Sequence, residues 1–483
     1  MRVHFVAVAG TGMGALAGLF LEAGHEVSGS DAAFDPPMGP ALASWGVRCL
    51  TGFDPAHLSP PPDLVVIGNV CRRDNPEARA AIDGGLAYTD MAHALGERIL
   101  PGRSPLVVAG THGKTTTSAM CAYLLERAGR EPGFLIGGLP KDFPASYRLG
   151  RARRVLVGPS EARRGPPFVV EGDEYDTAFF EKTPKCWHYR PEVAILTSIE
   201  HDHVDIYPTE ASYLDAFRGF VARVPASGLI VAAAADPRVR ALVAGVEAEV
   251  ATFALDGDDT GQVPPDYLAA IAVRDAQGTT FDLFAGGSAC GRFALRVPGE
   301  HNVRNAVAAI VAAVHGFGVS FEAARAALPG FSGVRRRQDL LGAPGGVSVY
   351  DDFAHHPTAV DETLRALASK HRGARLCAVF EPRSATACRA MHQEAYARAF
   401  GAAARVIVAP RGRATVDGDA LDLARLVDDL RAGGVDATSP GDLDGVVGEV
   451  AAWAREGDVV ALLSNGAFGG VPARVVAALE GRG

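Results

Sequence analysis

Short apolar runs alternate with helix-length segments along the chain, and this pattern predicts most of its elements. In the first third, Val3–Val8 and Glu26–Ser30 are predicted to be buried strands, and the helical stretch Leu16–Ala23 lies between them and ends at Gly24. Asp63–Gly68 supplies a further strand. Apolar runs of this length are typical of parallel strands covered on both faces, and their alternation with helices predicts an α/β sheet.

The same alternation returns further along the chain. In the last third, the predicted elements are strands Val347–Tyr350, Arg375–Phe380, Ala404–Ala409 and Val459–Leu463 and helices Thr358–Ala368 and Leu421–Arg431. The middle third begins with the strand Leu106–Ala109 and the helix-compatible segment Ala119–Ala128. The pattern therefore predicts successive doubly wound α/β units.

The chain length and two proline- and glycine-rich segments predict that these units form three domains. A chain of 483 residues is too long for one ordinary core and suggests roughly three domains of about 150 residues each. The proline- and glycine-rich stretches Pro101–Pro105 and Leu328–Gly333 are typical of linkers. We therefore predict domains at residues 1–104, 105–332 and 333–483.

Composition narrows the class of protein. The content of 48% hydrophobic and 21% charged residues is that of a globular protein, and the net charge of −9 argues against a nucleic-acid or membrane-surface binder. We find no signal peptide and no uninterrupted run of 18 or more apolar residues. The seven cysteines form no C-x-x-C pair and favour reduced thiols, so we expect a cytoplasmic protein with no membrane or nucleic-acid partner.

A phosphate-binding loop follows the first strand of the middle third. Gly110, Thr111, His112 and Gly113 form a glycine turn, and Lys114, Thr115 and Thr116 open the helix behind it. Such a loop turns backbone N–H groups toward an anion, Lys114 can reach the β- and γ-phosphates of ATP, and the Thr115 hydroxyl can bind magnesium. The usual first glycine of the motif is replaced by Val108. The alternative is a loop that only caps a helix.

A second glycine turn lies near the N-terminus. Its residues are Gly10, Thr11, Gly12, Met13 and Gly14, with Asp31 about 20 positions downstream. This spacing is the dinucleotide fingerprint, but it predicts only a pyrophosphate at a helix N-terminus and ribose hydroxyls near the acid. NAD and a uridine diphosphate sugar both satisfy it. Asn69 follows the strand Asp63–Gly68, at the sheet edge where such folds bind ligands.

Acidic residues and histidines follow two strands of the middle third. Glu171-Gly-Asp173-Glu174 ends one apolar run, and Glu200-His201-Asp202-His203 ends the other. If the second run stays extended, His201 and His203 share one face. Zinc is conceivable there, but hard carboxylates and the absence of a nearby cysteine favour magnesium or manganese. The alternative is a pair of acidic loops without a metal.

The remaining candidates lie at element ends. His301 and Asn302 open a long apolar helix, where a capping role is the default and contact with an adenine is the alternative. Arg335–Arg337 form a basic run, and further polar clusters follow strands of the last third: Asp351-Asp352-Phe-Ala-His355-His356-Pro357, Glu381-Pro-Arg383-Ser384 and Ser464-Asn465-Gly. Structural hydrogen bonding is at least as good an explanation of His355 and His356 as a ligand role.

Taken together, these motifs resemble the Mur ligase family over the whole chain. The resemblance rests on the N-terminal glycine turn, Gly-Thr-His-Gly-Lys-Thr-Thr-Thr, the Glu-x-Asp-Glu strand end, His-Asn-x-x-Asn, the Arg-Arg pair and Asp-Asp-Phe-Ala-His-His-Pro. It implies a uridine-binding Rossmann-like N-terminal domain, a central P-loop ATPase-type domain and a Rossmann-like C-terminal domain that closes on ATP.

Within the family, four segments are similar to members that act in peptidoglycan recycling: 171–180, 188–191, 380–384 and 464–470. The resemblance implies an ATP-dependent ligase that joins the lactyl carboxylate of UDP-N-acetylmuramate to the amine of L-alanyl-γ-D-glutamyl-meso-diaminopimelate. The alternative is the sister reaction of de novo peptidoglycan synthesis, which adds L-alanine alone. Ser198 stands where the L-alanine-adding relatives commonly have Asn, and we assign it no role.

The family mechanism proceeds through an acyl phosphate, and the resemblance implies a role for each motif. The catalytic residues would be Lys114, which steadies the transferred phosphoryl group, and Glu174 and His203, which with Thr115 hold Mg²⁺ or Mn²⁺. His301 and Asn302 would meet adenine, and Arg337 and Asp352 would close on the phosphates and ribose. Arg383, Ser464 and Asn465 would bind the peptide. The sequence makes no prediction of oligomeric state.

Two alternatives follow from single motifs. Residues 8–31 alone indicate an NAD-dependent oxidoreductase, and residues 106–117 alone indicate a P-loop binding module or regulatory NTPase. Each leaves the other glycine turn without a function.

Overall fold

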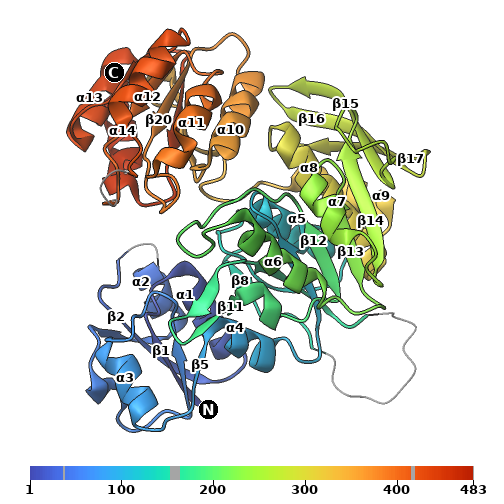
Figure 1. The fold of residues 1–483 in the computed structure, drawn as a ribbon, viewed down its shortest axis with the longest axis vertical. Coiled ribbons are helices and arrows are strands. Elements are labelled where there is room, and N and C mark those ends of the chain that lie inside the picture. The colour runs from blue at the N-terminus through green and yellow to red at the C-terminus, as the bar shows by residue number, and fades with distance from the viewer. Residues whose placement is uncertain (36–37, 153–163, 415–418, 482–483) are drawn as a thin grey trace.

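The computed structural model describes residues 1–35, 38–152, 164–414 and 419–481. Three α/β units follow one another along the chain, with the N-terminal unit at the bottom of Figure 1, the C-terminal unit at the top and the central unit between and beside them.

The N-terminal unit is built on a five-stranded parallel sheet of order β3-β2-β1-β4-β5. Its elements are β1 (Arg2–Val6), α1 (Thr11–Glu22), β2 (Glu26–Asp31), α2 (Met38–Trp45), β3 (Arg48–Thr51), β4 (Leu64–Ile67), α3 (Pro76–Asp83), β5 (Tyr88–Asp90) and α4 (Met91–Ala94). This order confirms the predicted Rossmann-like fold. Helix α1 begins five residues before its predicted start, directly behind the glycine turn, so its first N–H groups face the loop.

A ten-stranded sheet forms the centre of the second unit, in the order β17-β16-β15-β14-β13-β12-β6-β9-β7-β8. Its strands are β6 (Ser104–Ala109), β7 (Gly133–Leu135), β8 (Tyr147–Arg148), β9 (Pro167–Gly172), β12 (Val193–Leu196), β13 (Leu229–Ala233), β14 (Glu249–Leu255), β15 (Tyr267–Asp275), β16 (Gly278–Ala285) and β17 (Ser288–Leu295). The helices are α5 (Lys114–Arg127), α6 (Glu210–Val221), α7 (Pro237–Val243), α8 (Glu300–Val311) and α9 (Phe321–Ala327), and β10 (Asp176–Ala178) and β11 (Glu181–Pro184) form a separate hairpin.

The position of β6 explains why the chemistry gathers at one edge of this sheet. β6 is parallel to β12 on one side and to β9 on the other, and Ala109 is level with Leu196 and Gly172 at the ends of those strands. The phosphate-binding loop and both acidic segments therefore leave the same sheet edge side by side, as expected for the carboxyl ends of parallel strands.

The C-terminal unit has a six-stranded sheet of order β18-β19-β23-β20-β21-β22. Its elements are β18 (Asp339–Gly342), β19 (Ser348–Asp352), α10 (Pro357–Lys370), β20 (Leu376–Phe380), α11 (Gln393–Ala399), β21 (Arg405–Val408), α12 (Leu423–Ala432), β22 (Asp436–Thr438), α13 (Leu443–Trp453), β23 (Val459–Leu463) and α14 (Val471–Glu480). All neighbours are parallel except β18, which pairs antiparallel with β19 at the edge.

The units are joined in two different ways. One apolar core cluster runs from the N-terminal unit into the central unit, and Tyr147 of the central sheet packs on α1 and against the Trp45 ring at 4.8 Å between centroids. The two core clusters of the C-terminal sheet contain only residues of that unit. Its contacts with the central unit include polar ones, such as Lys141–Asp339 at 2.6 Å. The C-terminal unit is therefore the one best suited to move as a body.

The central antiparallel meander β15–β17 was not predicted from the sequence. Phe281 and Phe293 face each other across β16 and β17, both fully buried, with ring centroids 5.6 Å apart. Among the described residues, no helix is both long and apolar enough to cross a bilayer.

We expect Phe281→Ala to lower the free energy of unfolding by about 3–5 kcal/mol, because it leaves a cavity and removes the stacked partner of Phe293. Chemical denaturation followed by intrinsic fluorescence measures this loss. Val273→Ala on β15 is the control, since Val273 is 48% exposed and should change stability by less than about 0.5 kcal/mol. A loss below about 1 kcal/mol for Phe281→Ala would mean that the meander contributes little to the core.

Candidate active site

The loop between β6 and α5 requires glycine at two positions. Gly110 and Gly113 have φ values of 133° and 81°, a region that other residues rarely adopt. A Cβ atom at Gly110 would lie 2.1 Å from Thr197 Oγ1, and one at Gly113 would lie 2.5 Å from Asn305 Oδ1. The backbone therefore turns tightly against its neighbours and presents Lys114 as the first residue of α5.

Ser198 and Tyr213 brace the loop from outside. The Thr111 N–H donates to the Ser198 carbonyl at 2.7 Å, and the Thr111 hydroxyl lies 3.0 Å from the Tyr213 hydroxyl. Ser198, to which the sequence assigned no role, thus helps to shape the loop. Tyr213 carries no sequence signal, because its position on α6 looks like any buried aromatic residue.

Lys114 and Glu174 form a buried ion pair at the base of the loop. Lys114 Nζ donates to Glu174 Oε2 at 2.9 Å and to the Gly110 carbonyl at 2.7 Å. Burial opposes ionisation of both groups. For Glu174, the charges of Lys114 and His203 outweigh burial and lower its pKa to about 2, and the nearby carboxylates likewise raise the pKa of Lys114. Both side chains are therefore charged at neutral pH.

Glu171 is a second acid at this site that the sequence named without a role. Its Oε2 accepts from the Thr115 hydroxyl at 3.0 Å, and its Oε1 accepts from the Gly137 N–H at 2.5 Å. Burial, together with the charge of Asp173, raises the pKa of Glu171 to about 7. The sequence signal for Glu171 was its position at the end of an apolar strand. The sequence could not show that the Thr115 hydroxyl lies opposite this carboxylate.

His203 joins the same cluster, but His201 does not. His203 Nε2 lies 3.4 Å from Glu174 Oε1, whereas His201 Nε2 bonds to the Tyr207 carbonyl at 2.8 Å. The predicted common face is wrong because β12 ends at Leu196 and His203 has a φ of 51°, so the backbone is not extended through the pair. Asp202, buried between these histidines, is a further acid whose pKa is lowered, since the charges of His203 and His355 outweigh its burial.

The donor set of this cluster fits a hard divalent cation. The Thr115 hydroxyl bonds to the buried Glu171 carboxylate, and the buried Glu174 carboxylate contacts Lys114 and the His203 imidazole. Oxygen ligands are those that Mg²⁺ and Mn²⁺ prefer. The ionised Glu174 supplies the negative charge that a cation needs. Thr116 follows Thr115 on α5 and is buried to the same extent.

The predicted adenine residues lie where the central and C-terminal units meet. The capping interpretation of His301 and Asn302 is wrong: the N-cap of α8 is Gly299, and no side chain caps the helix. Asn302 instead donates to the Pro298 carbonyl at 2.7 Å and to Gln338 Oε1 at 3.3 Å, and His301 Nε2 lies 3.3 Å from Gln338 Nε2. Gln338 links the two candidates to the C-terminal unit.

The basic run Arg335–Arg337 separates into three environments. Arg335 is exposed, Arg336 donates to Asp351 Oδ2 at 3.0 Å, and Arg337 reaches Thr115 Oγ1 at 3.3 Å with its guanidinium 4.9 Å from the centre of the Phe353 ring. Arg337 is thus brought to the phosphate-binding loop from another sheet.

Asp352 is buried at the end of β19. Its carboxylate accepts from the N–H groups of Gln338 at 2.6 Å and Ala354 at 2.7 Å. It therefore fixes the turn that carries Arg337 and Gln338 toward the central unit.

The N-terminal glycine turn is open at its tip. Gly10 and Thr11 are exposed at the start of α1, while Met13 is buried beneath them. Asp31 Oδ2 accepts from the Ala9 N–H at 2.8 Å, which ties the acid to the turn.

Close packing explains the later glycines of this turn. A Cβ atom at Gly12 would lie 3.0 Å from Met91 Cε, and one at Gly14 would lie 2.3 Å from Met38 Cε. Asn69 is half-buried just beyond β4, at the same sheet edge.

The three peptide candidates gather at the ends of β20 and β23, which are parallel neighbours. The Ser464 hydroxyl donates to Glu381 Oε2, and Arg383 lies 3.8 Å from Glu381 Oε1. Asn465 Oδ1 is buried and has no hydrogen-bond partner among the described residues, which leaves it available to a ligand. Glu381 was quoted in the motif but not assigned.

A cavity of about 690 Å³ lies in the same unit, lined in part by Arg411, Arg413 and Asp422. The Gly412 N–H of this loop donates to the Pro382 carbonyl at 2.8 Å, so the cavity lies next to the segment that carries Arg383. A cationic wall of this kind suits an anionic ligand.

Three family models match the chain, one for each of the three α/β units. The Mur ligase family catalytic domain matches residues 2–100, the Mur ligase middle domain matches residues 108–313, and the Mur ligase glutamate ligase domain matches residues 336–466. UDP-N-acetylmuramate–L-alanyl-γ-D-glutamyl-meso-2,6-diaminoheptandioate ligase of Escherichia coli is 37% identical over 98% of this chain and 96% of its own. The chain belongs to the Mur ligase family.

Further relatives of this Mur ligase fall into two groups. A UDP-N-acetylmuramate–L-alanine ligase of Chloroflexus aggregans is also 37% identical, over 99% of this chain and 98% of its own. The crystal structure of a murein peptide ligase from Psychrobacter arcticus superposes with a TM-score of 0.73 at 34% identity and covers 99% of both chains.

Family membership decides between the functions drawn from single motifs. As a Mur ligase, the protein is an ATP-dependent enzyme that forms an amide bond, and its fold is the predicted α/β arrangement of three domains. Neither an NAD-dependent oxidoreductase nor a P-loop module alone accounts for all three matches.

Proposed function

We propose that this Mur ligase joins the lactyl carboxylate of UDP-N-acetylmuramate to the amine of L-alanyl-γ-D-glutamyl-meso-diaminopimelate, as a cytoplasmic step of peptidoglycan recycling. Relatives whose names state this reaction support it, and so does the segment similarity at residues 380–384 and 464–470. We also propose domain boundaries at residues 104/105 and 332/333.

The observation that carries the acceptor assignment is the paired charge in the segment that follows β20. Arg383 offers a cation and Glu381 an anion 3.8 Å apart, with the unpartnered Asn465 Oδ1 in the adjoining segment after β23. The free amino-acid end of meso-diaminopimelate carries one carboxylate and one ammonium group. An Arg–Glu pair is complementary to this zwitterion, and Arg411 and Arg413 of the adjacent cavity suit the remaining carboxylates.

Amide formation from a carboxylate needs activation, because its oxygen is a poor leaving group. The lactyl carboxylate attacks the γ-phosphorus of ATP, which releases ADP and forms an acyl phosphate. The peptide amine then attacks the acyl carbon, loses a proton and displaces phosphate. Lys114 would bind the transferred phosphoryl group, and Arg337 would neutralise phosphate charge from the C-terminal domain. His301 and Asn302 would contact adenine. These residues act by positioning and charge complementarity.

Thr115, Glu174 and His203 would hold magnesium, with Glu171 beside them. When bound, the metal neutralises phosphate charge. The N-terminal turn, with Gly10, Gly12, Gly14, Asp31 and Asn69, would bind the UDP-sugar.

We expect ADP release in the presence of UDP-N-acetylmuramate to be at least about 100-fold more efficient, as kcat/KM, with the tripeptide than with L-alanine, because only the tripeptide reaches the Arg383–Glu381 pair. A coupled assay with each acceptor measures this directly. Arg383→Ala should lower kcat/KM for the tripeptide by roughly 10–100-fold through loss of a charge-assisted hydrogen bond.

The control for this variant is Arg365→Ala on α10, where the arginine is 73% exposed and pairs with Asp361. A kcat/KM for L-alanine equal to or greater than that for the tripeptide would contradict the proposal and identify L-alanine as the acceptor.

A further inference from the structure

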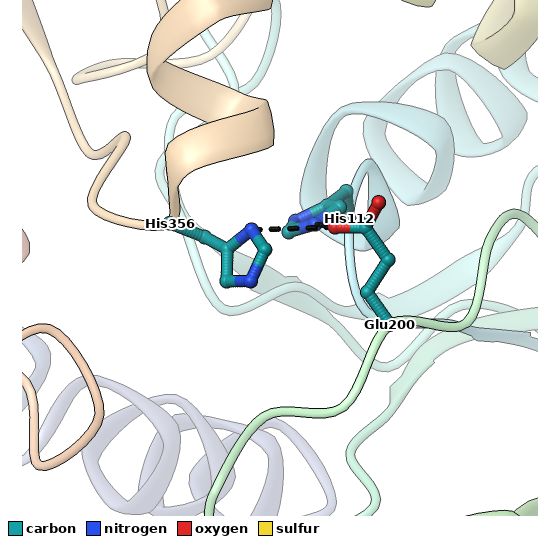
Figure 2. A group of neighbouring side chains, drawn as sticks. All are labelled: His112, Glu200 and His356. Atoms are coloured by element: carbon teal, nitrogen blue, oxygen red, sulfur yellow. Dashed lines mark hydrogen bonds and ion pairs between the residues drawn. The ribbon is translucent and has the colours of Figure 1, made fainter. Parts of the chain in front are cut away.

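Three side chains from three segments meet where the central and C-terminal domains touch. His112 comes from the phosphate-binding loop, Glu200 from the segment after β12, and His356 is the N-cap of α10. Figure 2 shows both imidazoles directed at the Glu200 carboxylate. None of the three belongs to the Thr115–Glu174–His203 group.

The distances suit a single small cation. His112 Nε2 lies 2.8 Å and His356 Nδ1 lies 3.3 Å from the same oxygen, Glu200 Oε2, and one ligand atom from each residue lies within 4.8 Å of the others. Tetrahedral zinc with bonds of about 2.0–2.1 Å separates its ligand atoms by roughly 3.3 Å. The separations of 2.8 and 3.3 Å are already near this value, and the third, between the two imidazole nitrogens, lies within 4.8 Å and would have to shorten as the ion binds.

Hydrogen bonding alone does not explain the approach of His356 to Glu200. The Thr358 N–H donates to His356 Nδ1 at 3.4 Å, so we assign the ring proton to Nε2 and a lone pair to Nδ1. His356 Nδ1 also lies 3.3 Å from Glu200 Oε2 with no ring proton between them, and the Thr358 contact is long enough for a cation to displace it and take the lone pair. A cation between the two atoms would satisfy both.

We propose that His112, Glu200 and His356 form a second type of metal site in this protein, which binds a zinc-like divalent cation and fastens the C-terminal domain to the central domain. Two imidazoles and one carboxylate are a common zinc set, with water in the fourth position. Magnesium prefers oxygen ligands and keeps its waters, so it does not compete well here. The ion draws two residues of the central domain onto the N-terminus of α10.

Zinc titration of the metal-free full-length protein, in excess magnesium, tests this site by calorimetry. The wild type is expected to bind one zinc ion per chain, and His356→Asn and Glu200→Gln are each expected to weaken binding at least about tenfold. Asn is chosen at position 356 because it can still cap α10. Zinc should also raise the thermal unfolding midpoint of the wild type and leave that of His356→Asn unchanged.

Glu174→Gln distinguishes the two metal sites. Its zinc affinity should stay within about twofold of the wild type, because Glu174 lies outside the three-residue cluster. Unchanged zinc affinity in both His356→Asn and Glu200→Gln, or loss of binding in Glu174→Gln, would overturn the proposal. Because zinc binding is measured without turnover, this result is independent of which acceptor the ligase uses.

Discussion

Lys114→Ala is expected to reduce ATP-dependent amide formation by about 10³-fold or more, while binding of UDP-N-acetylmuramate persists. Lys114 is the lysine of the phosphate-binding loop. Its ammonium group lies at the base of this loop, where it donates to the Gly110 carbonyl and to Glu174. Alanine removes this charge and also leaves the buried Glu174 carboxylate without its strongest partner. The transferred phosphoryl group would then lack its main stabilising contact.

Two measurements separate these effects. Single-turnover ADP formation reports phosphoryl transfer, and calorimetry with UDP-N-acetylmuramate reports the N-terminal site, for which we expect a Kd within about twofold of the wild type. Lys182→Ala is the matched control, because Lys182 is a 68% exposed lysine of the same domain whose ion pair is with Asp176. Loss of sugar-nucleotide binding together with ATP turnover would show that the two glycine turns do not act as separate sites.

The fold was largely predictable because most of its strands are short, fully apolar runs that alternate with helices, a pattern typical of a parallel α/β sheet. Val459–Leu463 matches β23 at both ends, since Asp458 and Ser464 bound a fully buried run. The meander β15–β17 was missed for the opposite reason. Its strands mix exposed and buried positions, and a register shift between Ile271 and Val273 breaks the alternation that would reveal β15.

The site was predictable as a set of motifs but not as a set of contacts. Sequence placed Glu174 and Thr115 near one metal because both follow parallel strands, whereas the opposition of Thr115 and Glu171 depends on the register of β6 and β9. The error at His201 arose because β12 ends at Leu196 and His203 has a positive φ, so the backbone is not extended through the two histidines. Contacts between domains, such as Arg337 with Thr115, leave no local trace in the sequence.

Glu174→Gln is expected to lower kcat by roughly 100-fold and to raise the magnesium concentration for half-maximal activity by about 10–100-fold. Glutamine keeps the size and one oxygen of the side chain, so Tyr213 and the loop retain a partner. What it loses is the negative charge, which is present at neutral pH because Lys114 and His203 hold the pKa of Glu174 near 2. In the variant, a magnesium ion between residue 174 and the triphosphate therefore has one negative charge fewer among its ligands.

His203→Ala should shift the same titration, but by less, because an imidazole brings no negative charge to the metal, whereas the ionised Glu174 beside it does. Steady-state ADP release as a function of free magnesium, with manganese in parallel, measures both variants. Asp176→Asn serves as the control, since Asp176 lies two residues along the same segment but pairs with Lys182. Magnesium curves that coincide with the wild type for both Glu174→Gln and His203→Ala would remove these residues from the metal site, and the buried ion pair of Lys114 and Glu174 would then have a purely structural role.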